Sequence, residues 1–163
     1  MPVLMFIILG VIIFLIASLA FVGHLLEARR SKLREQRKGF SCELRICGGM
    51  EDVYHTMTLK PAPEDQASVL EEIRTEHGEH TEKNEKNVSV DVLDQLMAFF
   101  EENHVSTWGN LPPREEQALD APTITVIFHV DETEYCFSSD QQLPVPDSIS
   151  RIRKIFSTCQ ARD

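Results

Sequence analysis

Charged side chains are missing from the first 26 of the 163 residues, and the motifs of the common enzyme classes are missing from the whole chain. No glycine-rich phosphate loop, no G-x-S-x-G nucleophile motif and no H-E-x-x-H metal motif occurs. The four cysteines have neither C-x-x-C spacing nor histidines at zinc-finger intervals, which argues against a structural zinc site. We therefore expect neither enzymatic activity nor a bound cofactor.

One long hydrophobic run stands at the start of the chain. Residues 3–22 contain a single polar side chain, Ser18, and fifteen of the twenty are Val, Leu, Ile or Phe. Twenty helical residues are ~30 Å long, which matches the hydrocarbon thickness of a bilayer. Inserting those fifteen side chains is favourable by roughly 5–9 kcal/mol, and the polar stripe of a soluble amphipathic helix is absent. Residues 1–26 are therefore predicted to form a transmembrane helix.

A cleaved signal peptide is the alternative, because Ser18-Leu19-Ala20 resembles the small-x-small pattern of a cleavage site. Three features favour the membrane helix instead. No Lys or Arg precedes the run, the run is longer than the ~7–15 apolar residues of a signal peptide, and the basic residues follow it.

Residues 27–38 form a basic segment directly after the hydrophobic run. The positive-inside rule places such a flank in the cytoplasm, with the N-terminus outside and the rest of the chain cytoplasmic. Each cation near an anionic leaflet contributes ~1 kcal/mol to membrane attachment, so the lipid bilayer is the first expected partner. The six candidate membrane-surface residues are Arg29, Arg30, Lys32, Arg34, Arg37 and Lys38.

The remaining residues, 39–163, form one predicted domain of strongly negative charge. They hold 24 acidic and 10 basic side chains, a net charge of about −14. Such a domain repels a phosphate backbone, so nucleic acid is excluded as a partner. Its cysteines fit free thiols in a reducing compartment. They are Cys42, Cys47, Cys136 and Cys159.

Alternation of apolar and polar residues predicts strands, and apolar residues spaced by three and four predict helices. Residues 67–77 fit either a short helix or a strand with one exposed side, and residues 78–87 carry no apolar side chain and are expected to be mobile. The other expected elements are strands at 40–47, 53–59, 123–130 and 135–137 and helices at 89–103 and 147–159. Ser89 is the expected N-cap of the first of these helices. The predicted fold is α+β, a small antiparallel sheet of four to five strands in the order β-β-(β)-α-β-β-α with two helices on one face.

Several landmarks recur together in this domain: a glycine hairpin, a helix ending in glutamates, a tryptophan loop, a Leu-Asp before a strand, an acidic turn and a proline-led last helix. They are Gly48-Gly49, Glu101-Glu102, Trp108-Gly109-Asn110, Leu119-Asp120, Asp131-Glu132 and Pro144 to Pro146. In these features residues 39–160 resemble a domain of uncharacterised membrane-anchored and lipoprotein-like proteins of Firmicutes, although Ala121 replaces a glycine of that pattern. The resemblance implies a bacterial membrane protein with a third strand at 67–77, and it implies no activity because none is known for that domain.

The densest group of metal-ligating side chains lies in a charged stretch at residues 76–82. Imidazole and carboxylate groups bind divalent metals when a segment orders around the ion. No apolar residue shields this stretch, which favours a solvated loop. A metal-responsive sensor is the alternative function that it leaves open. The candidate ligands are Glu76, His77, Glu79 and His80, with Glu82 beside them.

The single tryptophan marks the most distinctive surface of the domain. Trp108 is followed by Gly109, Asn110 and Leu111, and an exposed aromatic side chain is a frequent anchor in protein–protein interfaces. Trp108 and Leu111 are therefore candidate contacts for a membrane or cytoplasmic protein partner. The alternative is a lid that closes the helix–sheet core. The sequence thus predicts a membrane-anchored, non-enzymatic binding or scaffolding module.

Overall fold

The computed structural model describes residues 2–48, 53–64, 66–75, 81–114 and 121–160, with side chains from residue 14 onward except at positions 53, 75 and 160. The chain divides into two compact units, Met1–Gln36 and Arg37–Asp163. The boundary falls two residues before the end of the basic segment that the sequence sets apart, so the last two cations belong to the second unit.

The first unit is a single helix. Helix α1 (Pro2–Lys38) runs through both the hydrophobic run and the basic segment, and its last two residues belong to the second unit. An N-terminal helix was predicted and is confirmed. Over the residues that the structure describes, no helix combines the length and the apolar character that a bilayer span requires.

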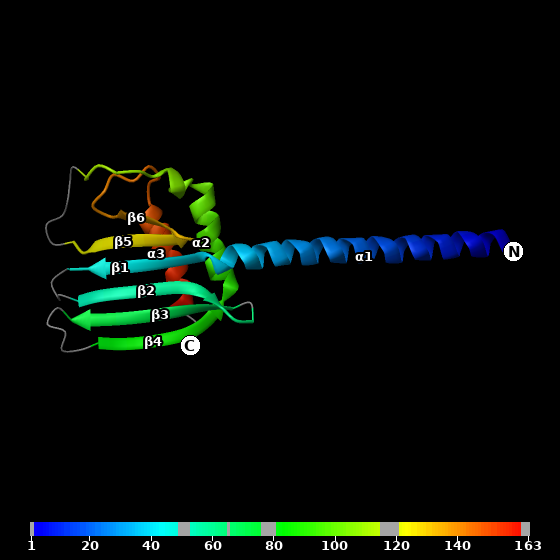
Figure 1. Cartoon of the computed structure of the whole chain (residues 1–163), viewed down its shortest axis with the longest axis horizontal. Helices are drawn as coiled ribbons and strands as arrows, with labels where there is room; N and C mark the ends of the chain where they lie inside the picture. Colours follow the sequence, from blue (N-terminus) through cyan, green and yellow to red (C-terminus); the bar gives the residue numbers. More distant parts are fainter. Residues whose placement is uncertain (1, 49–52, 65, 76–80, 115–120, 161–163) are drawn as a thin grey trace. The chain divides into compact units, whose positions relative to one another are not determined.

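The second unit contains one antiparallel sheet of six strands in the order β4-β3-β2-β1-β5-β6 (Figure 1). Every pair of neighbours is antiparallel. The first hairpin needs a residue with positive φ after β1, and Gly48 supplies it with φ at 82°. The strands are β1 (Phe40–Cys47), β2 (Val53–Ala62), β3 (Gln66–Thr75), β4 (Thr81–Ser89), β5 (Thr123–Val130) and β6 (Thr133–Ser138).

The α+β class is confirmed, but the predicted count of four to five strands is wrong. Residues 67–75 of the ambiguous segment belong to β3, and residues 81–87 of the segment expected to be mobile belong to β4. Strand β4 pairs along nine residues of β3 and forms polar cross-strand contacts, such as the hydrogen bond from the Ser68 hydroxyl to Glu85 at 2.6 Å. Backbone pairing holds this edge strand without an apolar face, so hydrophobic periodicity cannot detect it.

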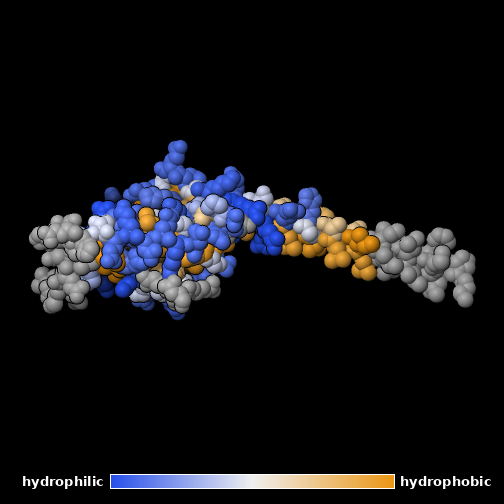
Figure 2. All heavy atoms as spheres, turned by 90° about the horizontal axis from the view of Figure 1, so that it is seen from below, coloured by the Kyte–Doolittle hydropathy of each residue, from blue (hydrophilic) through white to orange (hydrophobic). Residues whose placement is uncertain are grey.

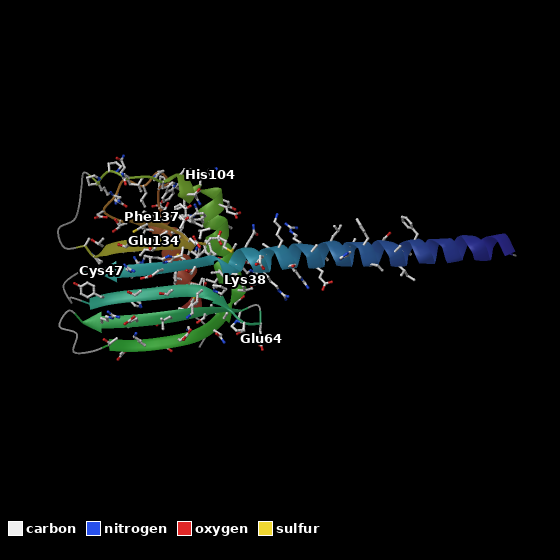
Figure 3. All side chains as sticks on the ribbon, in the orientation of Figure 1. Lys38, Cys47, Glu64, His104, Glu134 and Phe137 are labelled. Atoms are coloured by element: carbon white, nitrogen blue, oxygen red, sulfur yellow. The ribbon has the colours of Figure 1, made fainter. Side chains whose placement is uncertain are left out.

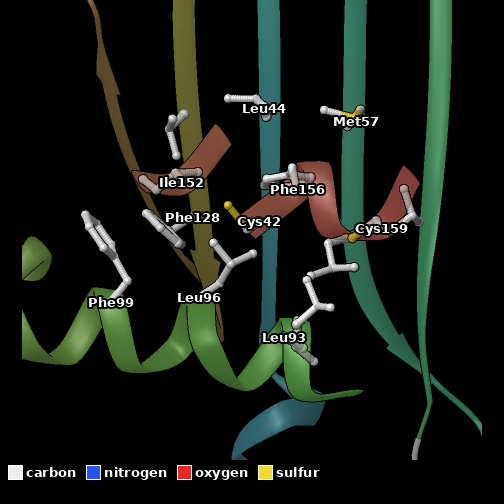
Figure 4. Packing of buried hydrophobic residues seen from close by; sticks show 14 of the residues in the cluster. Cys42, Leu44, Met57, Leu93, Leu96, Phe99, Phe128, Ile152, Phe156 and Cys159 are labelled. Carbon is white, nitrogen blue, oxygen red and sulfur yellow. The ribbon is translucent and has the colours of Figure 1, made fainter. Parts of the chain in front are cut away.

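Helices α2 (Val90–Glu102) and α3 (Ser148–Gln160) pack on the same face of the sheet (Figure 4). The Ser89 side chain caps α2 by accepting a hydrogen bond from the Asp91 N–H at 3.3 Å, as predicted. The fully buried Phe128 of β5 lies 6.4 Å from the Phe99 ring of α2 and 5.8 Å from the Phe40 ring of β1. The core therefore joins the centre of the sheet to both helices.

Candidate binding site at the Trp108 loop

The Trp108 loop follows the end of α2. His104 adopts a left-handed conformation with φ at 50°, which turns the chain into the short helix η1 (Val105–Thr107). Trp108 then folds back: its indole N–H donates a hydrogen bond to the Asn103 carbonyl at 3.1 Å. Its ring meets the ring of Phe137 edge to face at 4.8 Å. Phe137 lies on β6 (Figure 3). The half-buried Trp108 thus closes the end of the core while part of it stays accessible.

The chain after Trp108 is held against the segment that follows β6. Pro113 and Gln141 form an isolated antiparallel bridge. The Arg114 N–H donates to the Asp140 carbonyl at 2.7 Å, and the Gln142 N–H donates to the Pro112 carbonyl at 2.9 Å. Two segments far apart in the sequence are therefore fixed side by side, which gives the loop a defined shape.

A cavity of about 460 Å³ lies beside these paired segments, where α3 begins. Two arginines line it, Arg114 from the Trp108 side and Arg153 from α3. The first residues of α3 line it as well, and the N–H groups of a helix start carry partial positive charge. Asp147, with φ at 59°, is an acidic residue in the same lining.

The charge of this cavity differs from that of the unit around it. Two of the ten basic residues after position 38 line it, against 24 acidic residues over the same stretch. Arg114 and Arg153 are both exposed, and against the single acidic residue Asp147 they give the lining a net positive charge. Opposite charges attract at such a site, although more weakly than in a buried one. The cavity therefore favours an anionic group, such as the carboxylate of an Asp or Glu side chain.

The structure packs both predicted contact residues, each of them half-buried, against the core. Trp108 packs on Phe137, and Leu111 is half-buried against the same core. The lid interpretation accounts for these contacts. Their role in binding a partner stays a prediction.

A second cavity, of about 600 Å³, lies between β3, β4 and the two helices and contains a thiol in its lining. Cys159 is 2% exposed, and burial raises its pKa although Lys86 acts in the opposite direction. Burial raises the pKa of Cys42 well above its usual value, and partial burial together with the charge of Glu134 raises that of Cys136. These three thiols are therefore protonated at neutral pH, which makes them poor nucleophiles and poor metal ligands.

The predicted metal ligands Glu76, His77, Glu79 and His80 lie outside the described residues. Their neighbour Glu82 is an exposed residue of β4. Across the part of the chain that the structure describes, no group of three or more histidine, cysteine or acidic side chains is arranged to hold a metal ion.

Arg37, one of the six basic residues, has a clear structural role. Arg37 binds Asp94 of α2 through two hydrogen bonds, from its Nε at 2.7 Å and from its Nη2 at 2.6 Å, and its side chain is only 14% exposed. Such a two-point arginine–carboxylate pair is stronger and more directional than a single contact. Arg37 thus secures the first residue of the compact unit to α2. The other five are exposed on α1: Arg29, Arg30, Lys32, Arg34 and Lys38.

No family model matches the chain, and no curated protein sequence matches it.

Two residues of the site were not singled out from the sequence: Arg114 and Arg153, the two cations of the cavity. The sequence offered a signal only for Arg114, an isolated basic residue in an acidic domain, because Arg153 belongs to a basic cluster with Arg151 and Lys154. Only the bridge between Pro113 and Gln141, however, shows that they face one cavity.

Proposed function

We propose that the chain is a single-pass membrane protein whose compact unit is a non-enzymatic binding module for a protein partner on the cytoplasmic side. The observation that carries this proposal is the order of residues along α1, in which twenty almost wholly apolar positions precede six cations. Apolar residues of that number insert favourably into a bilayer, and the cations set the orientation.

The partner is a protein that offers an acidic side chain next to an apolar one. Arg114 and Arg153 attract the acidic group, while Trp108 and Leu111 supply half-buried apolar surface on the same loop. Interfaces combine an aromatic anchor with arginines in this way. The protonated thiols support a binding role over catalysis.

Fractionation of cells that express the full-length chain tests the membrane part of the proposal. We expect the protein to remain in the membrane pellet after extraction with alkaline carbonate and to leave it only in detergent. Recovery of the full-length protein in the soluble supernatant would contradict the proposal.

Crosslinking in native membranes, followed by purification of the tagged chain, tests the partner site. We expect one stoichiometric protein partner, lost in the Arg114→Ala/Arg153→Ala double variant and in Trp108→Ala. Lys154→Ala is the matched control for the cations, because Lys154 is exposed on α3 next to Arg153 and does not line the cavity. Tyr54→Ala, on the exposed part of β2, is the control for the aromatic residue. A partner retained by both site variants would contradict this site.

The metal-sensor alternative rests on the sequence at residues 76–82 alone. Titration calorimetry of the full chain with zinc decides it. Binding tighter than ~10 μM, about −7 kcal/mol, would support a sensor, and its loss in His77→Ala/His80→Ala would assign the ligands. Weaker binding rejects it.

A further inference from the structure

Strand β4 ends the sheet with one side of its backbone unpaired by any described strand. Edge strands expose a row of N–H and C=O groups that can pair with another chain. Most of β4 is exposed: Thr81 to Glu85 and Asn87 are exposed, Lys86 is half-buried, and Val88 is its single apolar residue. Figure 2, which views the molecule from this side, shows a mostly hydrophilic surface.

The charges of β4 are complementary to those of an antiparallel copy of the same strand. With Asn84 opposite Asn84, Glu82 stands opposite Lys86 and Lys83 stands opposite Glu85. Each charged side chain in this stretch then faces the opposite charge, which stabilises a pair of neighbouring strands. Thr81 and Asn87, both polar, face each other at the ends.

This arrangement also selects one register. A shift of one residue sets Glu82 against Glu85 or Lys83 against Lys86, depending on its direction. A shift of two sets Lys83 against itself or Glu85 against itself. Like charges directly opposite each other destabilise strand pairing, so the charge pattern rejects each of these neighbouring registers.

Two of these charged side chains, Lys83 and Glu85, also contact residues of β3 and β2. Lys83 lies 3.4 Å from Glu72, and Glu85 lies 3.4 Å from Lys60 and accepts a hydrogen bond from Ser68. A second copy would extend these pairs into rows of alternating charge across the two adjacent β4 strands.

We propose that β4 is a self-association edge, at which two copies of the chain pair antiparallel about Asn84. The partner is a second copy because the complementary sequence is the strand itself. Such an interface is isologous, with a two-fold axis perpendicular to the sheet. The two six-stranded sheets then form one continuous sheet, and since residues directly opposite point to the same face, both copies carry α2 and α3 on one side.

Disulfide crosslinking in membranes that contain the full-length chain tests the register. In a Cys47→Ser/Cys136→Ser background, the Asn84→Cys variant should form a covalent dimer under mild oxidation, because cross-strand partners bring Cβ atoms within about 4.5–5.5 Å. Asn87→Cys is the matched control: it is the same substitution three residues along the strand, and its two copies lie about 20 Å apart in this register. Equal crosslinking of the two variants, or none in Asn84→Cys, would overturn the proposal.

Charge reversal tests the electrostatic pairing. In the Asn84→Cys chain, Lys83→Glu/Lys86→Glu alone and Glu82→Lys/Glu85→Lys alone should each reduce crosslinking at least tenfold. Expressed together with different tags, the two variants should restore it as a mixed dimer, a result that a failure to fold cannot produce. Homodimers that persist in either variant, or the absence of a mixed dimer, would show that the charges instead keep β4 from pairing.

Discussion

At the scale of single residues, a few side chains position the surfaces that the proposals need. Trp108 is held by one hydrogen bond and one ring contact, so the loop that carries Leu111 and Arg114 starts from a fixed point. The backbone of Gly39 also fixes neighbouring segments. Gly39 precedes β1, and its carbonyl accepts a hydrogen bond from the Asp131 N–H at 2.6 Å, which ties the start of β1 to the turn between β5 and β6.

Two substitutions of Trp108 separate its ring from its N–H group. Trp108→Phe keeps a ring against Phe137 and loses the hydrogen bond to Asn103, so we expect the free energy of unfolding to fall by about 0.5–1.5 kcal/mol. Trp108→Ala also loses the ring contact and should cost about 3 kcal/mol. Urea unfolding of the detergent-solubilised chain, followed by circular dichroism, measures both. Equal losses would mean that the ring contributes nothing.

Gly39 faces the Asp131 carboxylate. A Cβ at this position would collide with a carboxylate oxygen, which is the end of an exposed side chain that can rotate aside, so Gly39→Ala should destabilise the chain by about 1 kcal/mol or less. The double variant Gly39→Ala/Asp131→Gly removes the obstructing carboxylate and suits the positive φ of position 131, which is 53°. Unfolding experiments should therefore show that the double variant recovers much of the loss. If the double variant does not recover stability, the Asp131 carboxylate is not the cause of the loss.

At the scale of elements, the strands owe their stability to different forces. Strands β1 and β5 bury alternate residues under the helices, and that burial is the dominant stabilising term. Strand β4 buries almost nothing and depends on pairing with β3 and on cross-strand contacts. Its pairing should therefore respond to charge and pH more than that of the central strands.

Glu85 makes that response testable. The Ser68 hydroxyl and Lys60 hold the pKa of its carboxyl below the ordinary 4.5. A depressed pKa in the folded state contributes stability above pH 4.5, and this contribution disappears as the pH falls through the lower folded value. Glu85→Gln should therefore lower the free energy of unfolding at pH 7, and the difference from the parent chain should shrink below pH 4. Glu132→Gln, in the exposed turn before β6, is the control. A difference that does not change with pH would contradict this origin.

At the scale of the whole molecule, charge is divided along the chain. The first unit is apolar and then basic, and the second is acidic. An anionic leaflet attracts the basic segment and repels the acidic unit, so the proposed anchor does not draw the binding unit onto the lipid.

Labelling of native thiols tests the orientation of the whole chain. Cys136 is exposed on β6, so a maleimide that cannot cross membranes reports the compartment of the second unit. We expect no labelling in intact cells and clear but slow labelling after permeabilisation, because the raised pKa of Cys136 leaves little thiolate at neutral pH. Cys136→Ser, which should lose most of that signal, is the control. Labelling of Cys136 in intact cells would place the acidic unit outside.

An element could be predicted where a pattern of nearby residues specifies it. Strands β1 and β5 and helices α2 and α3 carry apolar residues at regular spacing, because each must bury one face, and these elements were predicted close to their observed bounds. The Ser89 cap was also predicted, since it depends on neighbours within three residues. Strand β4 and the cavity of Arg114 and Arg153 were not, because both arise from pairing between segments distant in the sequence.

The sequence alone therefore determined the apolar run, the basic segment, the acidity of the second unit and the α+β class, since composition and short-range periodicity carry them. Tertiary structure decided the sixth strand, the inward packing of Trp108, the pairing of Arg37 with Asp94 and the convergence of two arginines on one cavity. Each of these depends on which distant segments the fold brings into contact, and no local pattern of residues records that choice.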